Sequence, residues 1–356
     1  MVHKNFKLNG QSFSQEELIE IGYSLIKEGE EHEISIGGFL LDWFNDSIEI
    51  IVQTSGSTGI PKQISLKKSQ MVNSALATGN FFRLKPGDSA LLCLSADFIA
   101  GKMMLVRAIV LGLELDIVAP SSNPLLNNSN TYNFCAMVPM QAKNALENLN
   151  QIKTLILGGA AVSSSLKQSL EGLITNCFET YGMTETITHI AARNLSNEKS
   201  LDEVLFHTLP NIIISTDNRE CLVIDAPKIS DSTIVTNDIV ELIGDNSFKW
   251  LGRFDNIINS GGIKLIPEQI EAKLFGFFEN RFFVAGIPDK SLGQKLILIV
   301  EGERKYDEII QSIKSLGLLS KYEIPKEVFI APSFVETKNG KVDRPKTLVL
   351  ILQKYL

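Results

Sequence analysis

The sequence predicts an α/β protein: a large N-terminal body with a mostly parallel sheet plus an antiparallel subdomain, then a small α+β C-terminal domain. From about residue 48, short β-branched runs alternate with longer helical segments, which is typical of a parallel sheet covered by helices. After about residue 200 the strands shorten and polar turns separate them, as in IIISTDNRECLVID. A third region opens at GRFDNIINSGGIK, so we expect one domain over residues 1–252 and another over 253–356.

The elements of the N-terminal body alternate in a regular order. Strands are predicted at 48–53, 90–95, 115–119, 133–138 and 153–159, and helices at 69–82, 100–113, 139–150 and 163–174. The C-terminal domain has strand-like RFFVAGIP and KLILIVEG and helix-like KYDEIIQSIKSLG. The most apolar stretch, residues 90–119, is interrupted by charged side chains that a membrane span would not tolerate, among them Asp97, Lys102, Arg107 and Glu114. We therefore read it as strand, helix and strand in a folded domain.

The composition excludes several classes of protein. A hydrophobic share of 44% with 21% charged residues is typical of a packed globular chain and not of a disordered one. The formal net charge is -7 and no run of basic residues occurs, so nucleic acid is not an expected partner. The four cysteines stand far apart in apolar segments, which favours reduced thiols over a disulfide framework. The N-terminus lacks the apolar core of a signal peptide, so we expect a cytoplasmic protein without membrane insertion.

Residues 54–62, TSGSTGIPK, form the most distinctive loop. The apolar run 48–53 precedes it, which places the loop at the carboxyl end of a predicted strand, where open α/β sheets bind ligands. Gly56 and Gly59 can bring backbone N–H groups close to an anion, and the hydroxyls and Lys62 add donors, a chemistry that suits a polyphosphate. The loop is not a Walker A motif, because Lys62 stands between Pro61 and Gln63. The alternative is a solvated turn.

Three further motifs carry chemistry. YGMTETITH, residues 181–189, follows a strand-like run, and a carboxylate beside hydroxyls suits Mg²⁺ on phosphates; the alternative is an exposed helix start capped by Thr184. TND and GRFD place charged residues beside turns, in positions that fit ribose hydroxyls or a hinge. KNGKVDR has an Asn-Gly turn before Lys341, and the alternative there is a plain hairpin with a solubilising lysine.

These segments together resemble the adenylate-forming superfamily, which includes acyl-CoA synthetases, luciferases and the adenylation domains of peptide synthetases. TSGSTGIPK, LGGAAV, YGMTET, TND, GRFDNIINSGGIKLIPEQIE and KNGKVDR occur in the order and approximate spacing of that superfamily over residues 54–344. Within it, SADFIAGKMM and TETITHIAAR most resemble the 2-succinylbenzoate–CoA ligases of menaquinone synthesis, in a compact form with a short N-terminal part.

The resemblance implies an ATP site and a moving C-terminal lid. Thr184 would contact the α-phosphate, Glu185 would hold Mg²⁺, and Lys341 would be the catalytic lysine of the lid, which turns about a hinge at Asp255. The remaining implied contacts are phosphate-binding (Thr54, Ser55, Gly56, Ser57, Thr58, Gly59, Lys62), adenine-binding (Gly158, Gly159, Ala160, Tyr181, Gly182), ribose-binding (Asp238, Arg253) and thioester-forming (Gly261, Gly262, Lys264). A carboxylate would attack the α-phosphorus, and the thiol of CoA would then displace AMP.

The acid is the least defined partner. A diacid needs a cation or several donors for its second carboxylate, and Lys102, His189 and Arg193 are the candidates; Phe98 stands where many relatives have a histidine at the acyl channel. Each candidate has an alternative: a lysine on a helix surface, a core-edge histidine and a solvated arginine. The rival functions are a ligase for another aryl or fatty acid and a non-catalytic adenine-nucleotide-binding module.

Overall fold

The structure, a computed structural model, describes residues 2–53, 63–196, 205–278, 280–302, 306–336 and 342–355. The chain divides into two compact units. Unit 1 consists of Met1–Ser215, Val223–Ile234 and Leu242–Lys249, and unit 2 of Thr216–Leu222, Val235–Glu241 and Trp250–Leu356. The domain boundary expected at residues 252/253 stays a prediction. The mobility of the C-terminal part also stays a prediction, because two compact units do not by themselves show that one moves.

The main sheet begins with parallel strands and ends with antiparallel ones. Parallel pairing joins β1 to β5, β5 to β4, β4 to β6, β6 to β7 and β7 to β8, after which β9, β10 and β14 pair antiparallel. The described strands follow the order β1-β5-β4-β6-β7-β8-β9-β10-β14-β13-β12-β11. Their bounds are β1 Lys7–Leu8, β4 Ser89–Leu92, β5 Glu114–Ile117, β6 Tyr132–Met137, β7 Ile152–Leu157, β8 Asn176–Gly182, β9 His189–Asn194, β10 Phe206–Thr208, β11 Ile213–Thr216, β12 Cys221–Asp225, β13 Ile234–Leu242 and β14 Ser247–Arg253. This sheet confirms the predicted α/β body with an antiparallel part.

The helices of unit 1 follow the predicted alternation. They are α1 Gln15–Glu28, α2 Glu31–Phe44, α3 Lys68–Phe82, α4 Ile99–Leu111, α5 Pro139–Asn144 and α6 Ser164–Leu170. Two differ most from the prediction: the segment 139–150 splits into α5 and a 3-10 helix, and the helix predicted over 163–174 ends at Leu170, two residues before Gly172, whose φ is +75°. In α4 eight residues from Gly101 to Ile109 are buried, which explains its nearly uniform apolar sequence. Among the described residues no helix has the length and apolar character to cross a bilayer.

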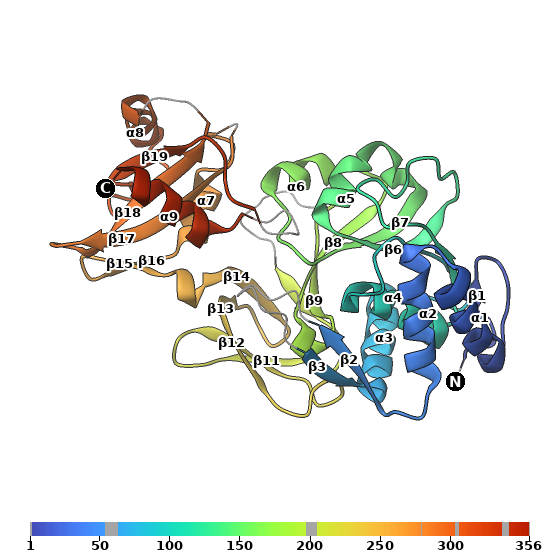
Figure 1. Ribbon diagram of the computed structural model, residues 1–356. Helices are drawn as coiled ribbons and strands as arrows, with labels where there is room; N and C mark the ends of the chain where they lie inside the picture. The colour runs from blue at the N-terminus through green and yellow to red at the C-terminus, as the bar shows by residue number, and fades with distance from the viewer. Residues whose placement is uncertain are drawn as a thin grey trace. The chain divides into compact units, whose positions relative to one another are not determined.

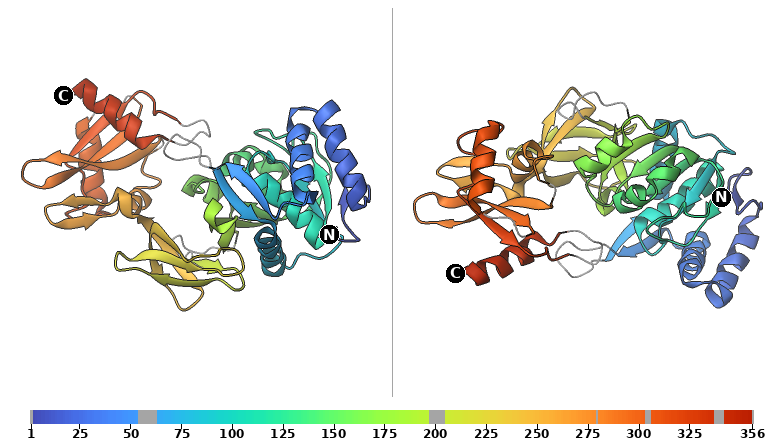
Figure 2. Two further views of the ribbon diagram at one scale, coloured as in Figure 1. Left: turned by 60° about the horizontal axis from the view of Figure 1, so that its bottom comes forward. Right: turned by 90° about the horizontal axis from the view of Figure 1, so that it is seen from above.

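Helices α1 and α2 form an antiparallel pair in unit 1, and they stay side by side in every view (Figures 1 and 2). The capping box between Ser14 and Glu17 starts α1. Gly22 and Gly37 face each other at the crossing: a Cβ on Gly37 would lie 2.6 Å from the carbonyl oxygen of Gly22. The two backbones can approach this closely only because both residues lack side chains.

The strand before the TSGSTGIPK loop is not part of the main sheet. β2, Glu49–Gln53, pairs antiparallel with β3, Gln63–Lys67, in a two-stranded sheet of their own. Gln53 lies opposite Gln63, so residues 54–62 connect the two strands of a hairpin. The loop follows a strand as expected, but this strand is not part of the parallel sheet, so that part of our expectation is wrong. A local sequence pattern predicts a strand and does not reveal its pairing partner.

Unit 2 contains a sheet that is covered on both faces. Its order is β16-β15-β18-β17, with β19 parallel to β18. The bounds are β15 Ile258–Ser260, β16 Ile263–Leu265, α7 Pro267–Lys273, β17 Phe282–Asp289, β18 Gly293–Glu301, α8 Tyr306–Leu316, β19 Glu327–Ala331 and α9 Arg344–Tyr355. Leu296, Leu298 and Val300 of β18 pack on the face shared with α7 and α8, while Ile297 and Ile299 pack on the other face with Ile351 of α9. This alternation explains the continuous apolar sequence of β18.

Candidate active site

The glycine loop after β7 is packed tightly against β8. A Cβ on Gly158 would lie 2.8 Å from Oγ1 of Thr180 and would displace that hydroxyl, and Gly159 has a φ of +76°, which favours glycine. The loop is also tied down at its far end, because the backbone N–H of Val162 donates to Oε1 of Glu179 at 3.1 Å. Gly158, Gly159 and Ala160 therefore follow the carboxyl end of β7 in a loop that is held at its end, and their contact with adenine stays a prediction.

Tyr181 is held by two other rings. Its ring centroid lies 5.8 Å from that of Phe206 and 5.2 Å from that of Phe248, both edge-on, and Phe206 and Phe248 stack on each other. Edge-to-face contacts of this kind fix a ring in one orientation. Tyr181 is therefore packed against two rings of the antiparallel strands, and its role toward adenine stays a prediction.

The turn from β8 to β9 is strained and tight. A Cβ on Gly182 would lie 2.2 Å from the carbonyl oxygen of Thr188. Ile187 has φ +65° and ψ −65° and sits at the centre of a γ-turn, closed by the Thr188 N–H donating to the Thr186 carbonyl at 2.7 Å. Such a conformation is rare for a β-branched residue and costs about 1–3 kcal/mol.

This turn presents Thr184 and Glu185 on a short 3-10 helix, Thr184–Thr186, with the Glu185 carboxylate exposed. Among the described residues no group of three or more His, Cys, Asp or Glu side chains is arranged around a common metal position. One exposed carboxylate beside a hydroxyl fits Mg²⁺, since that ion takes one or two protein carboxylates and completes its shell with phosphate oxygens and water.

Two predicted acyl-site residues already have close partners. Arg193 donates from Nε and Nη2 to Oε2 of Glu179, at 2.9 and 2.6 Å, so its charge is neutralised within the sheet. The Lys102 ammonium lies 5.4 Å from the ring centroid of Phe39, and burial lowers the pKa of Lys102. Phe98 is half exposed where α4 begins. The three residues do not share a partner or a cavity among the described interactions.

His189 lies at the end of β9 and is buried. Its Nε2 is 3.3 Å from Oγ1 of Thr78 on α3, and its Nδ1 is 3.5 Å from Oγ1 of Thr188. Burial, and then the positive charge of Arg107, hold the pKa of His189 well below its ordinary value. The imidazole is therefore neutral at pH 7 and serves as a hydrogen-bonding group.

Arg107 is a candidate that our sequence analysis missed. It is only 2% exposed on α4, its Nη2 donates to Thr188 Oγ1 at 3.1 Å, and its Nη1 lies 3.7 Å from the sulfur of Met104. Its Nε has no acceptor, and no carboxylate in the described part of the chain forms an ion pair with it. Burial lowers the pKa of Arg107 to about 10. An arginine within the apolar run AGKMMLVRAIVLGL was the signal, which we used only against a membrane span.

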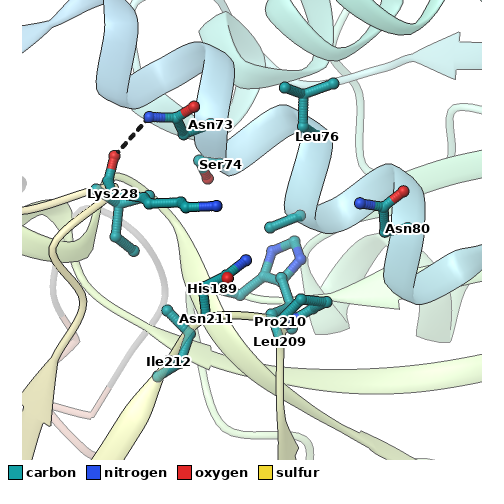
Figure 3. Close-up of a pocket in the computed structure, with 12 residues that line it drawn as sticks. Asn73, Ser74, Leu76, Asn80, His189, Leu209, Pro210, Asn211, Ile212 and Lys228 are labelled. Carbon is teal, nitrogen blue, oxygen red and sulfur yellow. Dashed lines mark hydrogen bonds between the residues drawn. The ribbon is translucent and has the colours of Figure 1, made fainter.

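A pocket of about 160 Å³ is lined by residues of α3, by His189 and by segments 209–212 and 228–229 (Figure 3), and Arg107 is not one of its lining residues. Ser74 and His189 line it, and Ser74 Oγ is 3.4 Å from the Thr188 hydroxyl that Arg107 contacts. The exposed Lys228 extends its ammonium group into the pocket, and its carbonyl accepts a 2.8 Å hydrogen bond from Asn73. The other lining residues are Leu76, Ala77, Asn80, Leu209, Pro210, Asn211, Ile212 and Ile229. The pocket thus joins an apolar wall to amides, a hydroxyl and the Lys228 ammonium group, and Arg107 is connected to it through the hydroxyls of Thr188 and Ser74.

The ribose and hinge candidates share one network in unit 2. Oδ1 of the buried Asp238 accepts from Trp250 Nε1 at 3.1 Å and from Arg253 at 3.4 Å. Arg253 also lies 3.5 Å from Asp255, which accepts a 3.1 Å hydrogen bond from Asn237. The structure brings Asp238, Arg253 and Asp255 into one network, and their ligand and hinge roles stay predictions.

The thioester candidates lie on a tight hairpin of unit 2. β15 and β16 pair from Ile258 with Leu265 to Ser260 with Ile263, leaving Gly261 and Gly262 as a two-residue turn. Their φ values of +59° and +82° are those of a type I′ turn, which glycine accommodates without strain. Lys264 projects from β16 and is exposed. The turn geometry explains the Gly-Gly pair, and its role in the thioester step stays a prediction.

Eight predicted site residues lie outside the described residues: Thr54, Ser55, Gly56, Ser57, Thr58, Gly59, Lys62 and Lys341. Their flanks are described. The first group is bracketed by the paired Gln53 and Gln63, and Lys341 directly precedes Val342, which forms an isolated antiparallel bridge with Glu336.

Comparison with known proteins identifies the family to which the chain is similar. The model of the family described as "AMP-binding enzyme" matches residues 42–226. A curated 2-succinylbenzoate–CoA ligase from Geobacillus sp. (strain WCH70) is 24% identical over 345 residues, covering 86% of this chain and 70% of that protein.

Solved structures give the same result. An acyl-CoA synthetase (AMP-forming)/AMP-acid ligase II-like protein from Dyadobacter fermentans is 36% identical with a TM-score of 0.61, over 90% of this chain and 95% of that one. The o-succinylbenzoate coenzyme A synthetase of Bacillus subtilis, in complex with ATP and magnesium ion, is 21% identical with a TM-score of 0.70, over 94% of this chain and 82% of that one. The chain belongs to the AMP-binding enzyme family, as the order of its motifs predicted.

Proposed function

We propose that this protein is an adenylate-forming acid–CoA ligase whose substrate is a diacid, 2-succinylbenzoate. The family match and the names of its relatives support the ligase class. In the reaction, a substrate carboxylate oxygen bonds to the α-phosphorus of ATP as pyrophosphate leaves. The CoA thiolate then bonds to the acyl carbon as AMP leaves, giving 2-succinylbenzoyl-CoA for menaquinone synthesis.

The observation that carries the substrate proposal is the buried, unneutralised Arg107. A pKa lowered to about 10 corresponds to roughly 3 kcal/mol of destabilisation of the charged guanidinium. A chain that keeps such a charge without a carboxylate of its own benefits from one that a ligand supplies. The hydroxyls of Thr188 and Ser74 connect Arg107 to the pocket, so a ligand carboxylate bound there would lie near the guanidinium charge and would accept a hydrogen bond from Ser74.

The rest of the pocket agrees with an aryl diacid. Leu76, Leu209 and Ile212 offer an apolar wall for a ring, and Lys228 places a second positive charge at the mouth. A fatty acid would leave Arg107 without a counter-ion and would gain nothing from Lys228. The geometry therefore favours a carboxylate that is recognised in addition to the one that is activated.

The nucleotide-side residues have roles that fit the same reaction. Thr184 and Glu185 stand on a rigid, strained turn, and Glu185 would hold Mg²⁺ while the 54–62 loop binds the phosphates. Mg²⁺ would neutralise negative charge on the phosphates when it is bound. Lys341 would add positive charge at the α-phosphate during adenylation. The Gly261–Lys264 hairpin would serve the thioester step, after the lid turns at Asp255.

Two single-carboxylate analogues test the proposal. Pyrophosphate release and acyl-CoA formation are measured with Mg-ATP, CoA and 2-succinylbenzoate, then with 2-butanoylbenzoate, 4-oxo-4-phenylbutanoate, benzoate and medium-chain fatty acids. We expect kcat/KM for the diacid to exceed that of each single-carboxylate analogue by about 30-fold or more, since an unpaired buried charge costs 2 kcal/mol or more. Lys228→Met should lower kcat/KM for the diacid by about tenfold or less, because an exposed charge contributes less to binding than a buried one.

Other outcomes would change the assignment. Equal turnover of the diacid and a single-carboxylate analogue would keep the ligase and reject the diacid site. Turnover of fatty acids alone would move the substrate to another class. Tight ATP binding without any pyrophosphate release would favour the non-catalytic nucleotide-binding module.

A further inference from the structure

A buried charge cluster joins the two sides of the predicted adenine site. Glu179 on β8 and Arg193 on β9 face each other directly across the antiparallel pair. The Glu179 side chain is 7% exposed, and its Oε2 accepts both Arg193 nitrogens and lies 3.4 Å from the Lys167 ammonium of α6. None of these groups was assigned to the nucleotide side from the sequence, and Arg193 was a candidate for the acid.

One arm of the cluster holds the glycine loop. Oε1 of Glu179 accepts the backbone N–H of Val162 at 3.1 Å, so a buried carboxylate anchors the end of the segment that begins at Gly158. A charged acceptor makes a stronger hydrogen bond than a neutral one and keeps the loop in a single position.

The other arm supports the tyrosine. The Arg193 guanidinium carbon lies 4.5 Å from the ring centroid of Phe206, and Phe206 contacts the ring of Tyr181 edge-on. Arginine stacks well on an aromatic face because its planar cation is attracted by the ring electrons. The position of Tyr181 therefore depends on where Glu179 holds Arg193.

We propose that Glu179 and Arg193 are positioning residues for the nucleotide, which fix the Gly158–Val162 loop and Tyr181 at the separation that admits an adenine ring. The inference rests on the proposed function, because it takes these two walls as the adenine site. It assigns Arg193 to ATP affinity and not to the acid. A buried ion pair contributes little net stability to a fold, so stability alone does not explain the pair of Glu179 and Arg193, whereas a positioning role does.

The test measures nucleotide affinity separately from acid turnover. Glu179→Gln keeps an oxygen for the Val162 N–H and removes the charge that holds Arg193; Arg193→Lys keeps the charge and removes the two-nitrogen contact and the stacking. Each variant is titrated with ATP by calorimetry, and KM is measured for ATP, the acid and CoA. The matched control is Glu114→Gln, which breaks the cross-strand pair of Glu114 with Lys7 in the same sheet.

We expect the dissociation constant and KM for ATP to rise about five- to thirtyfold in both variants, as for a loss of 1–2 kcal/mol. The maximal rate and the KM values for the acid and CoA should stay within about twofold, and the control should resemble the wild type.

If Arg193→Lys instead raises KM for the acid and leaves ATP binding unchanged, Arg193 belongs to the acid site and the inference is overturned. Unchanged ATP binding in both folded variants also overturns it. A wild type that binds no adenine nucleotide would refute the proposed function itself. Should Glu179→Gln not fold, Arg193→Lys still decides.

Discussion

Replacing Arg107 by methionine should stabilise the fold and remove the selectivity for the diacid. The charge costs about 3 kcal/mol through desolvation, as the lowered pKa indicates. Against this, the variant loses the hydrogen bond to Thr188, worth about 1.5–3 kcal/mol for a charged donor. Methionine fills much of the same volume, so the net effect is a gain of up to about 1.5 kcal/mol, or a rise of a few degrees in Tm.

The assay combines thermal unfolding with kinetics. For 2-succinylbenzoate, kcat/KM should fall by about 30-fold or more in Arg107→Met, while that of a single-carboxylate analogue changes little. Saturating diacid should raise the Tm of the wild type more than that of the variant, because only the wild type offers the ligand a buried counter-ion. A variant that loses more than about 2 kcal/mol of stability, or keeps its diacid activity within threefold, would refute the account of Arg107 as an unneutralised charge.

Three further predictions concern other parts of the chain. Because burial keeps the pKa of His189 depressed, below pH 6.5 the unfolded state takes up a proton that the folded state does not, and the free energy of unfolding falls. Between pH 6.5 and 5.5 the wild type should lose about 1 kcal/mol more of this free energy than His189→Gln, as measured by chemical denaturation. Gly37→Ala should destabilise by more than about 1 kcal/mol, since its Cβ would lie 2.6 Å from a carbonyl oxygen, whereas Gly38→Ala, with nothing within 4 Å, should stabilise α2 by about 0.5–1 kcal/mol; equal Tm values would contradict the close α1–α2 contact. Lys341→Ala should abolish pyrophosphate release, and unchanged ATP-dependent activity would reject the adenylation role of Lys341.

Much of the fold could be predicted because it depends on local patterns. The segments 69–82 and 133–138 became α3 and β6 within one residue, since each has a clear period and lies between turn signals. The pairing of β2 could not be predicted in this way. The run 48–53 has the same β-branched character as the parallel strands, and only its partner β3 places it in a separate hairpin. The predicted elements were right in type, and their neighbours had to come from the tertiary structure.

Two arginines show that the candidate site, like the strand pairing, could be predicted from the sequence only in part. The sequence suggested Arg193 as the cation for the acid and left Arg107 inside an apolar helix without a role. In the structure Glu179 neutralises Arg193, while no carboxylate in the described ranges reaches Arg107. The apolar run around Arg107 indicates that it is buried, but the local sequence does not show which of the two arginines is paired, because a counter-ion on another strand or helix decides that. An arginine is therefore a candidate for ligand recognition when the fold buries it and leaves its charge unpaired, and on this criterion we propose Arg107, Thr188 and the pocket that Lys228 lines as the acid site.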